Sequence, residues 1–173
     1  MLRKVSRLYL YGLLLLLLLA TAACQPVQAL PATQTTATAS AEAKLEQANQ
    51  AVVQRFYDEV MNQKKLDALG ELFDAKLIVH DLDFGANGID LPAMLASMPD
   101  FQATVSLWVV KDDLVTTVVT YNGTHTGSEL LGIPATGKPV TFSIIDSVRV
   151  KDGKITELWH NVPTSDILEQ IQP

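Results

Sequence analysis

Hydrophobic and polar residues alternate with a period of two in the last third of the chain. From Phe142 to Val150 every even position except one is apolar, and most odd positions are polar. A period of two is typical of a strand with one buried face. The exception is Asp146, an acid in the apolar row. The pattern therefore predicts a strand that brings a carboxylate to the protein interior.

A tight turn at residues 151–154 follows this strand, and the chain then returns as a second strand as far as Val162. The type of turn decides which residues of the two strands meet. If Gly153 takes the left-handed position of a three-residue turn with a bulge, His160 lies diagonal to Asp146. The two side chains are then within reach of each other.

A two-residue turn would have a different consequence. It would put Trp159 opposite Asp146 and turn His160 to the other face of the sheet. We favour the bulged turn, because it places most polar residues of both strands together on the outer face. Trp159 and Ile155 go with them in this arrangement.

The rest of the folded part shows helical spacing first and strand-like runs afterwards. The predicted elements are helices at 44–63, 66–73 and 91–98, strands at 77–81, 101–111 and 114–126, a loop containing Gly85 and Gly88, and a terminal helix at 165–171 capped by Ser165. Helices followed by antiparallel strands indicate an α+β fold, with the helices on one face of the sheet.

The N-terminus has the pattern of an export signal. A basic start is followed by an apolar run at residues 8–20, which is too short for a typical spanning helix. Cys24, the only cysteine, then stands where the bacterial lipoprotein cleavage box carries its lipidated residue. We therefore expect a lipoprotein signal at residues 1–23 and an anchor on Cys24. Ordinary cleavage after Ala29 is the alternative, and it would discard the cysteine.

Composition divides the chain beyond the signal into two parts. Residues 24–43 are rich in Pro, Ala, Thr and Gln and predict a flexible tether, whereas residues 44–173 suit a single domain. The whole chain has a formal net charge of −6, and signal cleavage removes three basic residues. Such a domain would be repelled by nucleic acid, which excludes nucleic-acid binding as a primary role.

Four segments of the chain carry a family resemblance in combination. They are residues 49–73 (NQAVVQRFYDEVMNQKKLDALGELF), 123–127 (GTHTG), 131–137 (LGIPATG) and the strand pair around 151–154. Together they resemble the SnoaL-like polyketide cyclase, or ester cyclase, family. The resemblance covers residues 47–172. It implies the cone-shaped α+β fold of nuclear transport factor two, with N-terminal helices packed on a curved antiparallel sheet that encloses a pocket.

The resemblance also implies a chemistry. The cyclases of this family close a ring by intramolecular aldol condensation, with no metal and no bound cofactor. One acid acts as general acid and base, and a histidine lies on the adjacent strand. The family's acid falls on His160 here and its histidine on Asp146, so the two residue types have exchanged strands. We expect no metal site, because the histidines and acids lack the short helical spacing of zinc ligands.

Asp146 and His160 are the candidate catalytic residues. Burial would raise the pKa of Asp146 and a nearby histidine would lower it, which makes this acid a tunable base. A histidine changes charge near neutral pH, so His160 is its candidate partner or proton donor. The structural alternatives are a buried acid that holds a backbone amide or the histidine, and a histidine at a sheet edge.

Four further residues are candidates for ligand contact. His80 ends the first predicted strand, which borders the cavity mouth in the resembled fold. Tyr57 is placed to point its hydroxyl inward from the first helix, and Trp108 to wall the cavity. His125 lies inside the GTHTG segment. Three of them also have a structural interpretation: helix core for Tyr57, a dimer face for Trp108 and the end of a strand for His125.

The sequence supports three hypotheses for the function. The first is an exported enzyme, an aldol cyclase, isomerase or lyase, that carries out acid–base chemistry on a small hydrophobic carbonyl compound or ester. The second is a non-catalytic lipoprotein of the bacterial envelope that binds an apolar small molecule or lipid. The third is a structural homodimer that uses the convex face of the sheet.

Overall fold

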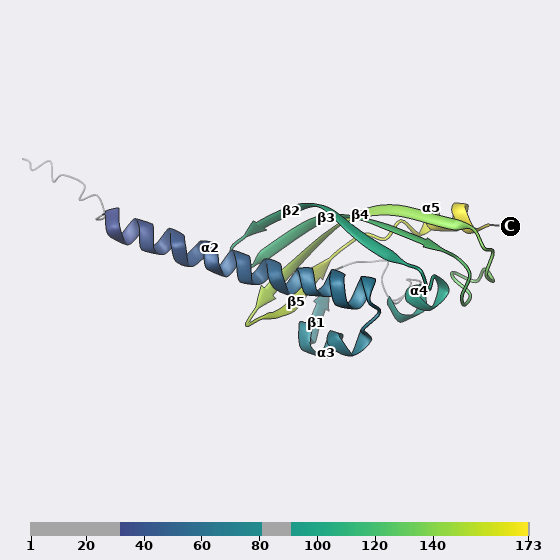
Figure 1. Cartoon of the computed structure of the whole chain (residues 1–173), viewed down its shortest axis with the longest axis horizontal. Helices are drawn as coiled ribbons and strands as arrows, with labels where there is room; N and C mark the ends of the chain where they lie inside the picture. The colour runs from purple at the N-terminus through teal and green to yellow at the C-terminus, as the bar shows by residue number, and fades with distance from the viewer. Residues whose placement is uncertain (1–31, 81–90, 173) are drawn as a thin grey trace, which may run out of the picture. The chain divides into compact units, whose positions relative to one another are not determined.

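The computed structural model describes residues 32–80 and 91–172. The predicted signal segment with Cys24 and the loop containing Gly85 and Gly88 lie outside this range. Within the described part, helices come first and strands dominate afterwards (Figure 1). The elements are α2 (Ala32–Arg55), the π-helix η1 (Phe56–Asn62), the 3₁₀ helix η2 (Leu66–Ala68), α3 (Leu69–Leu72), β1 (Phe73–Val79), α4 (Leu91–Ser97), β2 (Gln102–Lys111), β3 (Leu114–Thr124), β4 (Pro139–Lys151), β5 (Lys154–Trp159) and α5 (Thr164–Ile171). The predicted α+β class is confirmed.

The five strands form one sheet in the order β1-β5-β4-β3-β2. Neighbouring strands from β2 to β5 pair antiparallel, as predicted. The edge strand β1 pairs parallel with β5, so the sheet is mixed and the expectation of a purely antiparallel sheet is wrong. A parallel neighbour needs a crossover between the two strands. Here β1 is separated from β5 along the chain by all the other strands of the sheet.

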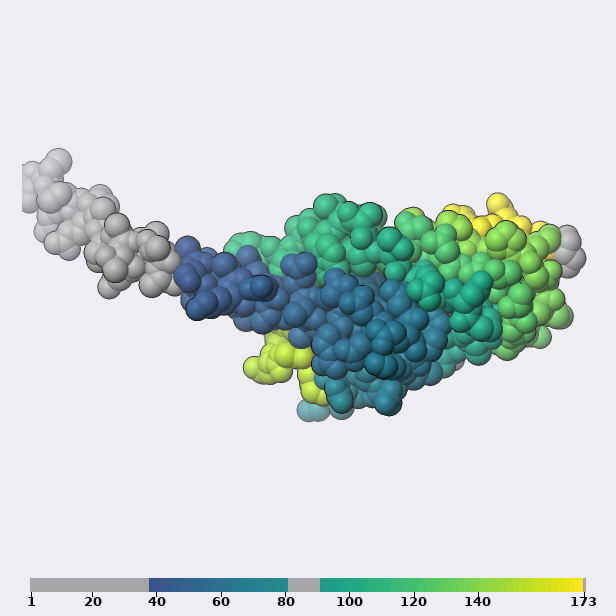
Figure 2. Space-filling model, viewed as in Figure 1, coloured from purple at the N-terminus to yellow at the C-terminus, as the bar shows by residue number. Residues whose placement is uncertain are grey.

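Several helices contact the sheet, among them α5 (Thr164–Ile171), which contacts β4. The π-helix η1 contacts β2, while α3 contacts β1 and β5. In the space-filling view the blue side chains of η1, η2 and α3 cover the strands that Figure 1 shows behind them (Figure 2). Among the described residues, no helix is both long enough and apolar enough to cross a membrane.

Three predicted boundaries are wrong. Helix α2 begins at Ala32, inside the predicted tether, and residues 38–43 are exposed. This stretch is rich in alanine, and the high helix propensity of alanine allows a helix there without burial. Strand β1 begins at Phe73, before the predicted start. Ser165 is not the cap of α5, because Pro163 precedes the helix and the Ser165 hydroxyl donates to Asp166 Oδ1 instead.

The turn between β4 and β5 differs from the favoured prediction. Lys151 pairs with Lys154, so the turn has two residues, Asp152 and Gly153, with φ values of 50° and 74°. Two consecutive positive φ values are typical of a type I′ hairpin turn. A bulge then lies inside the hairpin instead of at the turn, because the register shifts just after the Val150 pair.

Because of this bulge, the residues of β5 beyond it face the sides of the sheet that were predicted for them, although the predicted turn is wrong. Past the bulge, Val148 pairs with Leu158 and Ser147 with Trp159. One residue further along the same register, Asp146 comes level with His160. Ile155 lies before the bulge and is buried, with 1% of its surface exposed, so its predicted outward position is wrong.

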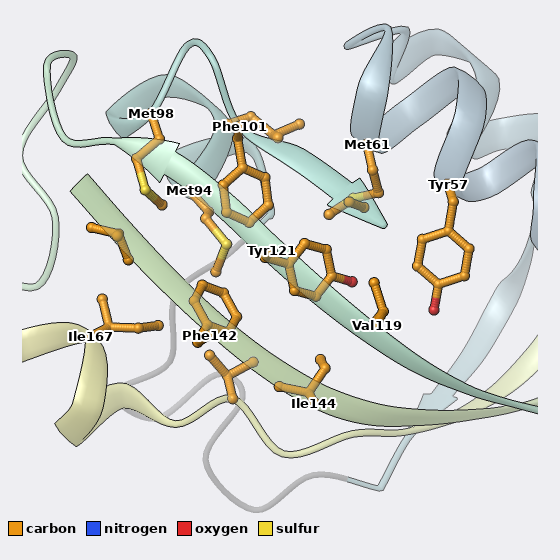
Figure 3. Packing of buried hydrophobic residues seen from close by; sticks show 14 of the residues in the cluster. Tyr57, Met61, Met94, Met98, Phe101, Val119, Tyr121, Phe142, Ile144 and Ile167 are labelled. Carbon is orange, nitrogen blue, oxygen red and sulfur yellow. The ribbon is translucent and has the colours of Figure 1, made fainter. Parts of the chain in front are cut away.

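The core lies between the helices and the inner face of the sheet. Even-numbered residues of β4 from Val140 to Val150 are buried, which confirms the alternation seen in the sequence. The Phe101 and Tyr121 rings stack with centroids 5.1 Å apart, and Phe142 packs at an angle beside both. Figure 3 shows these rings together with Met94 and Met98.

Candidate functional site

A pocket of about 390 Å³ lies between the helices and the inner face of the sheet. This volume is within the range of small-molecule sites. Most of its walls are apolar side chains. The lining residues are Val53, Phe56, Tyr57, Met61, Leu69, Phe73, Leu77, Val79, Leu91, Pro92, Met94, Tyr121, Phe142, Ile144, Asp146, Val148, Ile155, Leu158, His160 and Val162. Polar side-chain atoms come only from Tyr57, Tyr121, Asp146 and His160 among them.

Asp146 is the carboxylate of this pocket. It follows Ile144 in the inward-facing row of β4, and only 6% of its surface is exposed. On β3 it faces Thr117, which is also buried. The alternation of β4 thus forces an acid into an otherwise apolar row.

The two carboxylate oxygens of Asp146 have different surroundings. The Tyr57 hydroxyl donates to Oδ2 at 2.9 Å, and the Tyr121 hydroxyl approaches the same oxygen at 3.4 Å. Oδ1 has no hydrogen-bond partner among the described residues. Figure 3 shows Tyr57 reaching from the helix towards the sheet, with the Tyr121 hydroxyl turned to the same region.

Burial raises the pKa of the Asp146 carboxyl above its usual value. The hydrogen bonds from Tyr57 and Tyr121 and the proximity of His160 act in the opposite direction but do not cancel the effect of burial. Burial beside Asp146 also raises the pKa of both tyrosines, so their hydroxyls remain protonated donors at neutral pH. The site therefore holds a carboxylate that is a stronger base than one in water.

His160 lies beside the second oxygen of Asp146. Its Nδ1 is 3.6 Å from Oδ1, which is longer than a hydrogen bond. The His160 side chain is 11% exposed. The structure thus brings together the acid and the histidine that the sequence places on adjacent strands.

A buried acid with a raised pKa costs stability when it ionises. The unfolded state loses this proton at a lower pH than the folded state, so stability falls as the pH rises through the folded-state pKa. We expect Asp146→Asn to increase the free energy of unfolding by about 1 kcal/mol at pH 7 and to lose this advantage near pH 4. Urea denaturation at the two pH values measures the difference.

The exposed acid Asp67 offers a control for this prediction. Asp67→Asn should change the free energy of unfolding by less than about 0.5 kcal/mol at either pH. The expected stabilisation would be contradicted if Asp146→Asn were less stable than the wild type at pH 7, or if its advantage grew on acidification.

Two of the other predicted ligand contacts are not part of the pocket lining. The His80 ring stacks on Trp159 with centroids 4.4 Å apart, and its Nε2 is 3.0 Å from Glu157 Oε2. Neither His80 nor Trp108 is among the residues that line the pocket. Trp108 instead packs edge-on against the Tyr57 ring, with centroids 6.0 Å apart.

His125 is completely buried and holds its loop together. Its backbone carbonyl accepts hydrogen bonds from the amides of Thr136 and Gly137. Its ring nitrogens contact Ser128 O at 3.1 Å and Thr136 Oγ1 at 3.3 Å. The structure therefore gives His125 a place at the strand end, outside the pocket lining.

Two polar residues near Asp146 were not among the sequence candidates. They are Tyr121 and Thr117, which both belong to the inward-facing row of β3. The alternation of β3 contained this signal. Thr117 lies opposite Asp146 and Tyr121 opposite Phe142, and this register of β3 and β4 was not predictable because a long connection rather than a tight turn joins the two strands.

No three His, Cys, Asp or Glu side chains within the described part of the chain are close enough to hold a metal ion. The polar groups of the pocket are one carboxylate, one imidazole and two phenols. Such groups can accept, donate or pass on a proton. The site therefore has the side chains of a proton-transfer centre with apolar walls.

Helices beside a mixed sheet, with an apolar pocket between them, define an α+β fold. The model of the SnoaL-like polyketide cyclase family matches residues 51–171, and the chain belongs to this family. The resemblance noted in the sequence is thereby confirmed. No curated protein matches the chain in sequence.

Solved structures share this fold. IdmH, a putative polyketide cyclase from Streptomyces antibioticus, is 28% identical with a TM-score of 0.59, over 70% of this chain and 96% of its own. AclR, a putative hydroxylase from Streptomyces galilaeus, is 21% identical with a TM-score of 0.62, and the match covers 74% of this chain and 99% of AclR. A putative SnoaL-like polyketide cyclase from Jannaschia sp. CCS1 is also 21% identical with a TM-score of 0.62, and the match covers 75% of this chain and 96% of the cyclase.

Proposed function

We propose that this protein catalyses proton transfer on a small hydrophobic carbonyl compound or ester, with Asp146 as the base. The observation that carries the proposal is the place of this carboxylate. It is buried in an apolar pocket, and one of its oxygens lacks a hydrogen-bond partner among the described residues. A base with a raised pKa takes up a proton more readily than a free carboxylate does.

The chemistry requires only the groups of the pocket. Asp146 would remove a proton from the carbon next to a carbonyl group, and the electron pair would form an enolate. In an aldol ring closure the enolate carbon attacks a second carbonyl of the same molecule, which becomes an alkoxide. His160, protonated, would give that alkoxide its proton. Membership of the SnoaL-like family and the name of IdmH support this class of reaction.

The alternative is a binding protein for an apolar small molecule or lipid. The extent of apolar wall favours it, because sixteen of the twenty lining residues are apolar and burial of apolar surface alone can hold a ligand. For either function we propose the location expected from the N-terminal pattern. The protein would be exported and attached to the membrane through a lipid on Cys24.

Isotope exchange separates the enzyme from the binder. The soluble domain is incubated in D₂O with a series of small hydrophobic ketones and esters, and NMR follows deuterium uptake next to the carbonyl group. The proposal expects exchange well above the buffer rate for at least one compound that also binds. Tight binding of several compounds with exchange at the buffer rate for all of them would favour the binding function.

A further inference from the structure

The neighbours of Asp146 form a directed chain of hydroxyl groups. Tyr57 OH lies 2.7 Å from Thr117 Oγ1 and 2.9 Å from Asp146 Oδ2. A tyrosine hydroxyl has one hydrogen to donate, and an ionised carboxylate can only accept. When Tyr57 donates to Asp146, the hydrogen in the other contact must therefore come from Thr117. The chain runs from Thr117 to Tyr57 to Asp146.

All three groups are held by the fold. Thr117 and Asp146 are partners across β3 and β4, and both are buried. Tyr57 is 2% exposed and belongs to the π-helix η1. The wider turn of a π-helix changes the direction of the side chains that come after it, and such segments are frequent at functional sites. The Tyr57 ring is also packed against Phe56 and Trp108, so its hydroxyl has little freedom to move.

The chain of hydroxyl groups gives the two carboxylate oxygens of Asp146 different surroundings. Oδ2 accepts from Tyr57 and lies 3.4 Å from Tyr121 OH, whereas Oδ1 faces His160 Nδ1 at 3.6 Å. A bond held by a donor that is itself polarised by a second hydroxyl is stronger than an isolated one. Rotation of the carboxylate would break this bond, so its orientation is fixed.

We propose that Tyr57, oriented by Thr117, is a positioning residue that fixes Asp146 so that Oδ1 receives the proton of the substrate. This inference rests on the proposed function and specifies what orients the carboxylate of its base. The proton moves from the substrate carbon to Oδ1, while Oδ2 keeps the hydrogen bond from Tyr57 throughout. Tyr57 acts through Asp146 and does not itself exchange a proton.

The test is Tyr57→Phe, which removes the hydroxyl and keeps the ring. Loss of a donor to the ionised carboxylate raises the pKa of Asp146. Two results are expected. The ¹³C titration midpoint of the Asp146 carboxyl moves up by about one pH unit, and the acid limb of the pH–rate profile moves with it. At the pH plateau kcat falls about tenfold while KM changes less than about threefold, because the apolar walls are intact.

Tyr121→Phe is the matched control, since it removes the same group from the same pocket at a longer distance. Its effect on the Asp146 midpoint should be less than half that of Tyr57→Phe. Thr117→Val keeps the shape of the side chain and should shift the midpoint upward by less than Tyr57→Phe. If Tyr57→Phe does not fold, the Thr117→Val shift decides instead.

The inference would be overturned if the Asp146 midpoint stayed unchanged in these variants, or if Tyr57→Phe and Tyr121→Phe gave equal shifts. Unchanged kcat at the plateau in Tyr57→Phe would overturn it as well. The titration needs no substrate. A wild-type protein that turns over none of the compounds would therefore contradict the proposed function, while the midpoints would still test the role of Tyr57.

Discussion

Asp146→Asn is expected to lower the rate of turnover by about a thousandfold while leaving ligand affinity within about threefold of the wild type. The loss is the usual contribution of a positioned general base. Asparagine has nearly the same shape and can still accept from Tyr57, but it cannot take up the proton of the substrate. The affinity depends on the apolar walls of the pocket, which the substitution does not touch.

Two measurements on one protein preparation check this prediction. Ligand affinity is obtained by calorimetry or fluorescence titration, and turnover by the exchange assay at saturating ligand. Asp67→Asn, a change of the same kind on the surface, should leave both values unaltered. Equal loss of turnover and affinity in Asp146→Asn would contradict a role for Asp146 as the base, and it would favour a structural or binding role.

Gly127→Ala is expected to destabilise the fold by about 3 kcal/mol, the largest stability effect that we predict. A Cβ atom at this position would lie 1.9 Å from the backbone oxygen of Ala96 at the end of α4. The backbone of α4 cannot yield as a side chain can. It is bonded there, since the amides of Gly127 and Ser128 donate to Ser97 O and Ala96 O.

Gly70→Ala provides the control for the same chemical change. Gly70 lies in α3, and a Cβ there meets no atom within 4 Å. Alanine is favoured over glycine in a helix, so this variant should be as stable as the wild type or up to about 1 kcal/mol more stable. Chemical denaturation of both variants measures the difference. Equal stability of Gly127→Ala and Gly70→Ala would show that the contact with α4 is not required.

A substitution at Gly127 should also change the shape of the pocket wall. Met94 and Leu91 line the pocket from α4, the helix against which Gly127 is packed. Movement of α4 alters the apolar wall without altering Asp146. The Gly127→Ala variant, where it remains folded, is therefore expected to lose affinity for apolar ligands.

The approach of Asp146 to His160 could be predicted because the acid interrupts a clear apolar alternation and the histidine follows on the next predicted strand. The alternation in β4 fixes the inward face of Asp146, and a conspicuous turn lies between the two strands. The predicted type of turn was nevertheless wrong. Two positions can hold the extra residue of a hairpin, the turn or the strand, and the alternation of β5 is too short to distinguish them.

Tyr121 and Thr117 could not be placed from the sequence. Their approach to Asp146 depends on how β3 aligns with β4, and the connection between these strands is too long to fix a register. Tyr57 was recognised as a candidate, but its hydrogen bond depends on the π-helical turn of η1, for which the sequence has no clear signal. Local patterns predicted the elements, and long-range packing determined the site.

Titration of the Asp146 carboxyl in the wild-type domain shows whether this group can act as a base in the pocket. The ¹³C resonance is assigned by its absence in Asp146→Asn and is followed with and without a saturating hydrophobic ketone. We expect a pKa above the ordinary value of about 3.9, and a further rise when the ligand displaces water from the pocket. An ordinary or lowered pKa that does not respond to the ligand would contradict a working base inside this pocket.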